Sequence, residues 1–315
     1  MRTPRPRGTM SEHVFAALRG QTPLDPTIAP SSREDSAITL WSSYELHHRG
    51  FDDVDESWEW DPDLLRVRAG LERALEERVR TLVGDLPAAG DDPVQTLIDL
   101  IENHDDGPGV STHVARHATR DDALEVLKHR SIYHLKETDT TAWVVPRLTT
   151  VPKAAVMEVL FDEYGNGDPN RLHHHLFERA MEAAGLDPTY GAYIDEAPVE
   201  ILEMNSASAM FGLHRRWLGA VCGHFAAFEA TSSNPSRLMA RGLRLLGFPD
   251  VVAEYYDEHV EADAVHEQIA LRMICGSLMA EDPRHVETVF FGAKACLVLE
   301  DAYAQSLLTA KVPAA

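Results

Sequence analysis

Apolar residues recur every three or four positions through almost all of the chain from residue 121 onward. This spacing places them on one face of an amphipathic α-helix. Turn-forming clusters such as GNGDP, SSNPS and GFPD separate several of the periodic segments. No stretch shows the alternating polarity of a half-buried strand, so we predict an all-α fold. The predicted helices span residues 121–136, 150–165, 170–184, 195–213, 214–230, 234–246, 249–265, 266–280 and 283–308.

The first third of the chain follows a different pattern. Residues 1–36 are rich in Pro, Ser and Thr and predict a flexible N-terminal arm. Helical periodicity runs from residue 37 to about residue 86 and returns at 93–105, whereas the Gly-, Pro- and Asp-containing stretch 105–121 predicts a linker. We therefore expect three parts: an arm (1–36), a helical extension (37–110) and a larger helical domain (111–315).

The composition of the chain disfavours several classes of function. The 315 residues are 44% hydrophobic, enough for a substantial core, and carry a formal net charge of -22. So acidic a chain is poorly suited to binding nucleic-acid phosphates or an anionic membrane surface. No apolar run approaches the roughly 20 residues of a membrane span. Cys222, Cys275 and Cys296 stand alone in apolar stretches, which is typical of reduced thiols in a cytoplasmic protein.

Several carboxylates and imidazoles lie in helix-like stretches, some directly beside apolar neighbours. Such groups are expensive to bury unless they are paired or bind a metal ion. Their distribution over several helices suits a two-metal carboxylate site inside a helical bundle. Carboxylates mixed with imidazoles favour iron or manganese, and the absence of accompanying thiolates disfavours structural zinc. The six residues are Glu137, Glu163, His173, Glu229, Asp263 and His266.

Each of these candidate metal-ligand segments, taken alone, also has a simpler explanation. His259, Asp263 and His266 are spaced by four and then three, which puts them on one helical face, but a solvated face carrying a His–Asp pair has the same spacing. Glu229 follows an apolar run, yet it precedes the SSNPS turn and can be a helix-end residue that reaches water. The sequence therefore leaves both interpretations open when these segments are taken one at a time.

Glu163 and His173 present a geometric problem. Ten residues separate them, so in one straight helix their side chains would point roughly 80° apart. A break at 165–169 must therefore turn the chain if both side chains are to meet. His173 shares its predicted inward face with Leu176 and Phe177, whereas His174 and His175 are expected at the surface.

The order of these residues resembles the heme-oxygenase-like diiron oxidases and oxygenases, also described as iron-containing redox enzymes. The resemblance rests on the Glu163-Tyr-Gly-Asn-Gly segment, the spacings from Glu137 to Glu163 and on to His173, and the final Asp263-x-x-His266, and it covers roughly residues 120–308. It implies a seven-helix bundle that binds two iron ions instead of heme.

The resemblance also implies a ligand set. Glu137, Glu163 and His173 would serve one half of the site, and Glu229, Asp263 and His266 the other, with Glu163 as the bridging carboxylate. Some relatives carry a further carboxylate four residues before the Asp, where this chain has His259, which we include as a seventh metal ligand beside the second iron. Tyr164, His224 and Tyr256 are the candidates for holding the imidazoles.

By resemblance, two ferrous ions would activate O2 as co-substrate to oxidise a small amine- or carboxylate-bearing metabolite, by N-oxygenation or oxidative C–C cleavage. Such an enzyme can draw on an external electron donor and can form a homodimer. Two other functions stay open: a cofactor-independent or thiamin-salvage-type enzyme on the same fold, and a non-enzymatic helical protein whose acidic face binds a basic partner.

Overall fold

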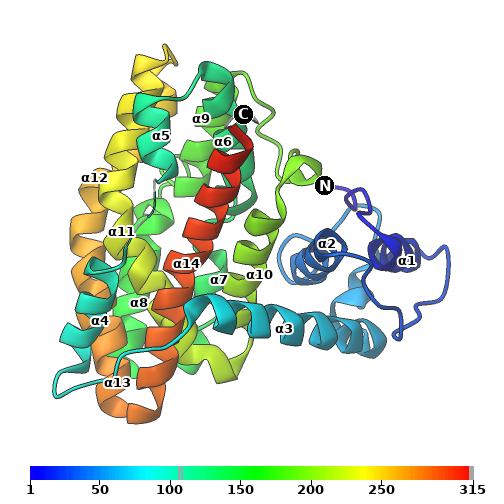
Figure 1. Ribbon diagram of the computed structural model, residues 1–315, viewed down its shortest axis with the longest axis horizontal. Helices are drawn as coiled ribbons and strands as arrows, with labels where there is room; N and C mark the ends of the chain where they lie inside the picture. The colour runs from blue at the N-terminus through cyan, green and yellow to red at the C-terminus, as the bar shows by residue number, and fades with distance from the viewer. Residues whose placement is uncertain (106, 108, 312–315) are drawn as a thin grey trace.

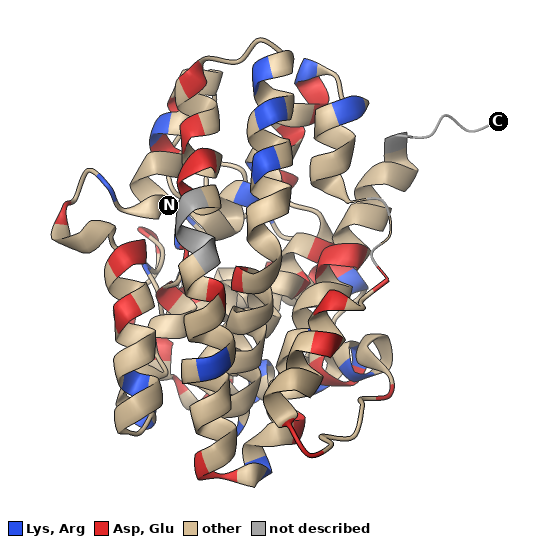
Figure 2. Cartoon of the chain, turned by 90° about the vertical axis from the view of Figure 1, so that its left-hand side faces the viewer, with Lys and Arg blue, Asp and Glu red and all other residues tan. Residues whose placement is uncertain are grey.

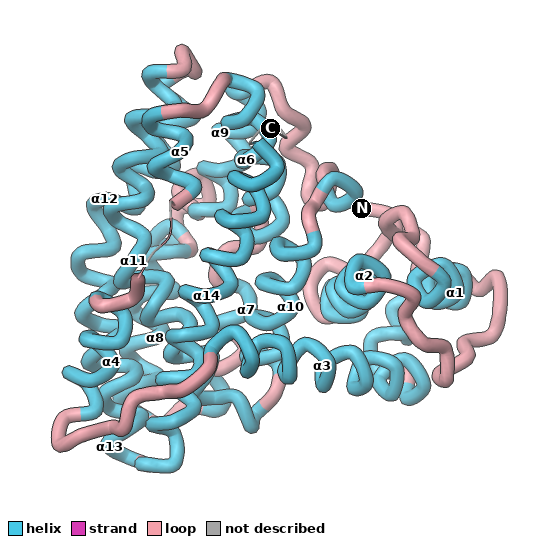
Figure 3. The backbone as a smooth tube through the Cα atoms, in the orientation of Figure 1, coloured by secondary structure: helices cyan, strands magenta, loops and turns pink. Residues whose placement is uncertain are grey.

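A computed structural model describes residues 1–105, 107 and 109–311, without the side chains of residues 261–264 and 311. Every regular element in this part of the chain is a helix, and Figure 3 shows only helices and connecting loops. The all-α prediction is confirmed. None of the helices that the structure describes combines the length and apolar character that a bilayer crossing requires.

The helices fall into an N-terminal set and a larger bundle. The N-terminal set consists of α1 (Thr9–Leu18), α2 (Arg33–Glu45) and α3 (Pro62–Val83). The bundle contains α4 (Pro93–Glu102), α5 (Val110–Arg116), α6 (Arg120–His134), α7 (Asp139–Ala142), α8 (Thr150–Glu163), α9 (His173–Ala184), α10 (Val199–Leu213), α11 (Leu218–Leu245), α12 (Asp250–Gln268), α13 (Ser277–Glu281) and α14 (Val286–Lys311). Shorter helical turns are η1 (Glu56–Trp60), η2 (Val145–Arg147), η3 (Gly165–Gly167), η4 (Ile194–Glu196), η5 (Arg215–Trp217), the π-helical η6 (Ile269–Gly276) and η7 (Pro283–His285).

Helix α11 is the centre of the bundle. It packs against α12 on one side and α14 on the other, while α9 contacts both α6 and α12 (Figure 1). The N-terminal helices stand beside this bundle: α2 lies against α10, and α3 reaches across to α14. The interior enclosed by α6, α8, α9, α11 and α12 is where the candidate site residues lie.

The N-terminal segment contains more helix than the sequence predicted. No helix was expected before residue 37, but α1 lies within this stretch and α2 begins at Arg33. Asp35 accepts hydrogen bonds from the backbone N–H groups of Met10 (3.0 Å) and Ser11 (2.7 Å), which satisfies the first turn of α1. Phe15 is fully buried. The short apolar face of α1 was hidden among Pro- and Ser-rich flanks, and the division of the chain into three parts stays a prediction.

Two predicted interruptions are helical instead. The expected linker 105–121 contains α5, whose Val110 and Val114 are buried. Helix α11 continues through SSNPS with Pro235 in its interior, although proline costs a backbone hydrogen bond there. Its C-terminal half is held by packing, since Met239 and Leu243 are buried. Tertiary contacts therefore override the local breaker signal.

Acidic side chains are spread over the molecule and not gathered in one element. Asp and Glu total 51 against 29 Lys and Arg, and Figure 2 shows both signs interspersed along many helices. Many of these charges are paired, for example Arg130 with Glu300 at 2.6 Å and Arg33 with Glu203 at 2.6 Å. The excess of negative charge is thus a distributed property of the surface.

Two glycines allow α11 and α14 to approach each other closely. A Cβ at Gly292 would overlap the backbone carbonyl of Ala220, and one at Gly223 would overlap that of Val289. Because the obstructing atoms are backbone and not flexible side-chain ends, the helices would have to separate to admit even a methyl group.

We expect Gly292→Ala to destabilise the protein by about 1–3 kcal/mol, the usual cost of overpacking. Gly70→Ala in α3 is the matched control, because a Cβ there meets only Arg73 at 3.9 Å. That control should be neutral or should stabilise by up to about 1 kcal/mol through better helix propensity. Thermal unfolding of both variants measures the difference, and equal effects would contradict the close-packing explanation.

Candidate metal centre

The turn after α6 presents Glu137 to the interior. The sequence predicted Glu137 inside a helix, but α6 ends at His134 and Thr138 adopts a left-handed φ of 64° before α7. Tyr255 donates a hydrogen bond to Oε2 of Glu137 at 2.8 Å, and Nδ1 of His134 lies 3.2 Å from Oε1. Although burial favours the neutral acid, His134 and His259 outweigh it and lower the pKa of Glu137 well below its usual value. Glu137 is therefore a buried, oriented carboxylate.

An interruption of the helical structure between α8 and α9 brings Glu163 and His173 together, as their ten-residue separation required. Glu163 ends α8 and His173 begins α9. The three residues of η3 between them all have positive φ, with Gly165 at 73° and Gly167 at 84°. Nδ1 of His173 consequently lies 2.8 Å from Oε2 of Glu163. Burial lowers the pKa of His173, but the Glu163 carboxylate outweighs it and the pKa is raised overall.

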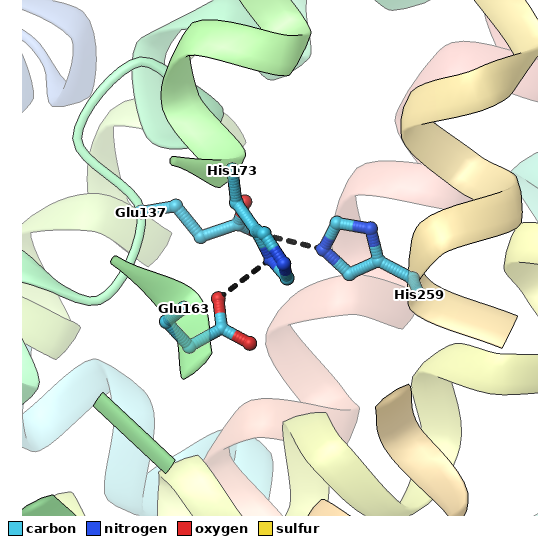
Figure 4. Close-up of side chains that lie close together, drawn as sticks. All are labelled: Glu137, Glu163, His173 and His259. Carbon is cyan, nitrogen blue, oxygen red and sulfur yellow. Dashed lines mark ion pairs between the residues drawn. The ribbon is translucent and has the colours of Figure 1, made fainter. Parts of the chain in front are cut away.

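His259 lies with Glu137 and His173, and not beside the second half of the site, as the resemblance had implied. Its Nε2 is 3.6 Å from Oε1 of Glu137, and its ring is 4.6 Å from that of His173 (Figure 4). His259 and His266 are seven residues apart in α12, or about 10 Å along the axis, so they face opposite ends of the cluster. Nδ1 of His259 donates a hydrogen bond to the carbonyl oxygen of Tyr255 at 2.7 Å, which orients the ring, and Nε2 is the nitrogen nearer Glu137.

The second group consists of Glu163, Glu229 and His266. Nδ1 of His266 lies 3.4 Å from Oε1 of Glu163 and 3.3 Å from Oε2 of Glu229. Its other nitrogen, Nε2, pairs with Asp162 at 2.9 Å. Burial lowers the pKa of His266, but the three neighbouring carboxylates outweigh it and raise the pKa to about 9. Glu229 is buried in the middle of α11, so the alternative of a helix-end residue that reaches water is wrong.

These residues form two groups that share one carboxylate. Atoms able to bind a metal lie within 4.8 Å of one another in Glu137, Glu163, His173 and His259, and likewise in Glu163, Glu229 and His266. The structure thus brings six of the seven predicted side chains together. Asp263 belongs to α12, but its side chain lies outside the described residues. Assignment of these side chains as metal ligands stays a prediction.

The donor set fits metal ions well. All six described side chains are buried, and three of them are carboxylates whose burial needs compensation. Nδ1 of His173 and Nδ1 of His266 are buried and make no hydrogen bond, although carboxylate oxygens lie near both. A metal ion bound by each nitrogen and by the carboxylate beside it would satisfy these buried atoms. The three cysteines are buried and free, as expected for reduced core residues, and none belongs to either group.

The residues that orient the cluster differ from those predicted. Tyr164 bonds Asp139 at 3.1 Å, His224 packs against the ring of Phe211, and Tyr256 lines a separate cavity. The orienting groups are instead Tyr255 and His134 at Glu137 and Asp162 at His266. Helical spacing could have found two of them, since His134 lies three residues before Glu137 and Tyr255 four before His259.

A cavity of about 310 Å³ lies beside the cluster, between α5, α6, α11, α12 and α14. Val126, Arg130 and His134 line it at four-residue intervals along one face of α6. His134 is the last residue of this face, and Glu137 follows it by three residues in the turn after α6. His134 thus touches both the cavity and Glu137, whose Oε1 lies 3.2 Å from its Nδ1.

Comparison with known proteins agrees with this geometry. The sequence model of the family described as iron-containing redox enzyme matches residues 124–301. The matched stretch runs from α6 into α14 and includes all seven predicted ligands. The all-helical structure is consistent with the heme-oxygenase-like fold predicted from the sequence. No curated protein matches the chain.

Proposed function

Because the chain belongs to the family of iron-containing redox enzymes, we propose that it is a non-heme diiron oxygenase or oxidase. The observation that carries this proposal is the position of Glu163 in both ligand groups. A carboxylate has two oxygens and can bind two ions at once, which suits a pair of irons better than two unrelated sites. The organic substrate is proposed to be a small amine- or carboxylate-bearing metabolite.

Each side chain has a role in this proposal. Glu137, His173 and His259 would hold one ion, Glu229, His266 and Asp263 the other, and Glu163 both. With Asp263, four carboxylates would balance the four positive charges of two ferrous ions. Tyr255 and His134 fix the direction of the Glu137 carboxylate, and Asp162 fixes the ring of His266.

When bound, ferrous ions would supply the electrons that start O2 reduction, and further electrons would come from the organic substrate or an external donor. The protein's part is to fix the ligand geometry and to exclude water. Buried carboxylates on α8 and α11 and imidazoles on α9 and α12 meet these needs, because each side chain is fixed by the helix that carries it or by the turns beside it.

Oxygen uptake tests the proposal. Protein loaded anaerobically with ferrous iron should consume O2 on mixing, and the right organic substrate should increase the amount consumed. Metal-free protein and zinc-loaded protein are the controls and should consume none. Full activity without metal would instead support a cofactor-independent enzyme on the same fold.

We also propose the cavity beside His134 as the place where the substrate enters. Ala304 of α14 lines this cavity, and Ala304→Trp should fill much of it. We expect the variant to lose most substrate-stimulated O2 uptake while still binding iron. Ala310→Trp is the control, because Ala310 is exposed on the same helix. Unchanged stimulation in Ala304→Trp would place substrate entry elsewhere.

A further inference from the structure

A buried ion pair joins the N-terminal helices to the turn that carries Glu137. Glu45, the last residue of α2, and Lys136 are both buried, with Oε2 and Nζ 3.0 Å apart. Tyr190 donates a hydrogen bond to the other carboxylate oxygen of Glu45 at 2.7 Å. Burying two charges costs desolvation free energy that their attraction often fails to repay. A role in positioning explains this pair better than a role in stability.

A second residue from the N-terminal part of the chain, Arg49, also contacts this turn. Arg49 donates a hydrogen bond to the carbonyl oxygen of Leu135 at 3.2 Å, and its guanidinium lies over the ring of Tyr190 at 4.4 Å. Leu135 and Lys136 are the two residues immediately before Glu137. The turn lies beyond the end of α6 and is closed by single backbone hydrogen bonds, from Lys136 to Tyr133 at 2.9 Å and from Asp139 to Lys136 at 3.2 Å. Thr138, on the other side of Glu137, has a positive φ.

We infer that the end of α2 positions Glu137 for metal binding, with Glu45 as a positioning residue that acts through Lys136. This inference rests on the proposed function, because it requires Glu137 to be a metal ligand. The residues that match the family begin at residue 124, so the N-terminal helices lie outside the matched region. Their described side chains supply no atom to either ligand group. Their contribution to the centre is therefore geometric.

The expected effect follows from the strict geometry of metal bonds. Ligand positions must be correct to about 0.2 Å, and partners that orient a ligand are worth about 10–100-fold in metal affinity. Releasing Lys136 would free the adjacent Glu137 backbone to move by more than that tolerance. Iron bound by Glu137, His173 and His259 should weaken most, and the His266 group should change less.

Three variants test the inference. Glu45→Gln keeps the hydrogen bond from Tyr190 but leaves Lys136 unpaired, and Glu45→Gln combined with Lys136→Met removes both charges at similar volume. Arg33→Gln is the matched control, since it breaks an α2 contact with Glu203 that is remote from the turn. Ferrous-iron affinity, the visible spectrum of the Co2+-loaded protein and the unfolding temperature are measured for each.

We expect Glu45→Gln to lose about 10–100-fold in iron affinity and to alter the Co2+ spectrum. The double variant should recover the unfolding temperature but not the affinity or the spectrum. Arg33→Gln should lower only the unfolding temperature. Recovery of all three properties in the double variant would show a purely structural pair and overturn the inference. If Glu45→Gln fails to fold, the double variant alone decides.

Failure of this inference can be distinguished from failure of the proposed function. A wild-type chain that binds no iron would end the proposed function itself. A wild-type chain that binds two irons, together with a double variant of unchanged affinity and Co2+ spectrum, would overturn only the role of Glu45.

Discussion

Replacing Glu163 by alanine is expected to abolish binding of both metal ions and all O2-dependent activity. Among the described residues, Glu163 alone belongs to both ligand groups. Removing a group that merely orients a ligand costs about 10–100-fold in affinity or activity, and loss of a shared ligand should exceed that. Iron per chain after anaerobic loading and desalting, together with O2 uptake, measures the effect.

Two comparisons make the Glu163 result specific. His266→Ala removes a residue of one group only and should leave a protein that retains one ion. Glu158→Ala changes an exposed carboxylate of the same helix and should retain both. All three proteins should keep the helical circular dichroism of the wild type. Retention of two ions by Glu163→Ala would mean that the two groups do not share this carboxylate.

Ferrous iron is expected to raise the unfolding temperature substantially. Without metal, imidazoles and a tyrosine hydroxyl lie beside the buried carboxylates of Glu137, Glu163 and Glu229, and a metal ion would compensate these carboxylates further. At free iron 100-fold above the dissociation constant, each independently bound ion adds about 2.7 kcal/mol to the free energy of unfolding. That corresponds to roughly 4 °C per ion for a chain of this size. Calorimetry at several iron concentrations gives the shift.

Hydrogen exchange should show where this stabilisation acts. Residues 255–270 of α12 and η6 include His259 and His266 on one side of the cluster, so their amides should exchange faster without iron than with it. Glu163→Ala should show fast exchange in both conditions. Exchange in this segment that is slow and unchanged by iron would contradict metal-dependent stabilisation of this helix.

The main helices and most residues of the cluster could be predicted from the sequence, because both produce recognisable local sequence patterns. Helical periodicity is repeated along α8, α10 and α14, so nearly every long helix of the bundle was located within a few residues. Glu163 was recognisable because it closes an apolar run, and the resemblance to the family marked both Glu163 and His173 as ligands. Their ten-residue separation also required the break that η3 supplies.

The features that could not be predicted from the sequence depend on contacts between segments that are distant along the chain. The pairing of Glu45 with Lys136 joins residues 91 positions apart, and neither side chain has a local pattern that identifies the other. Helix α11 passes through Pro235 because of its packing, which no local propensity records. The grouping of His259 with His173 follows from how α12 lies against α9, whereas the resemblance to relatives with a carboxylate at this position had placed His259 beside the second iron.

The most direct test is a crystal structure of the ferrous-loaded protein with anomalous scattering measured at the iron edge. We predict two iron peaks roughly 3.5–4 Å apart, the usual separation in two-metal sites. One should contact Glu137, His173 and His259, the other Glu229 and His266, and Glu163 should contact both. A single peak, or two peaks that do not share Glu163, would contradict the proposed diiron centre.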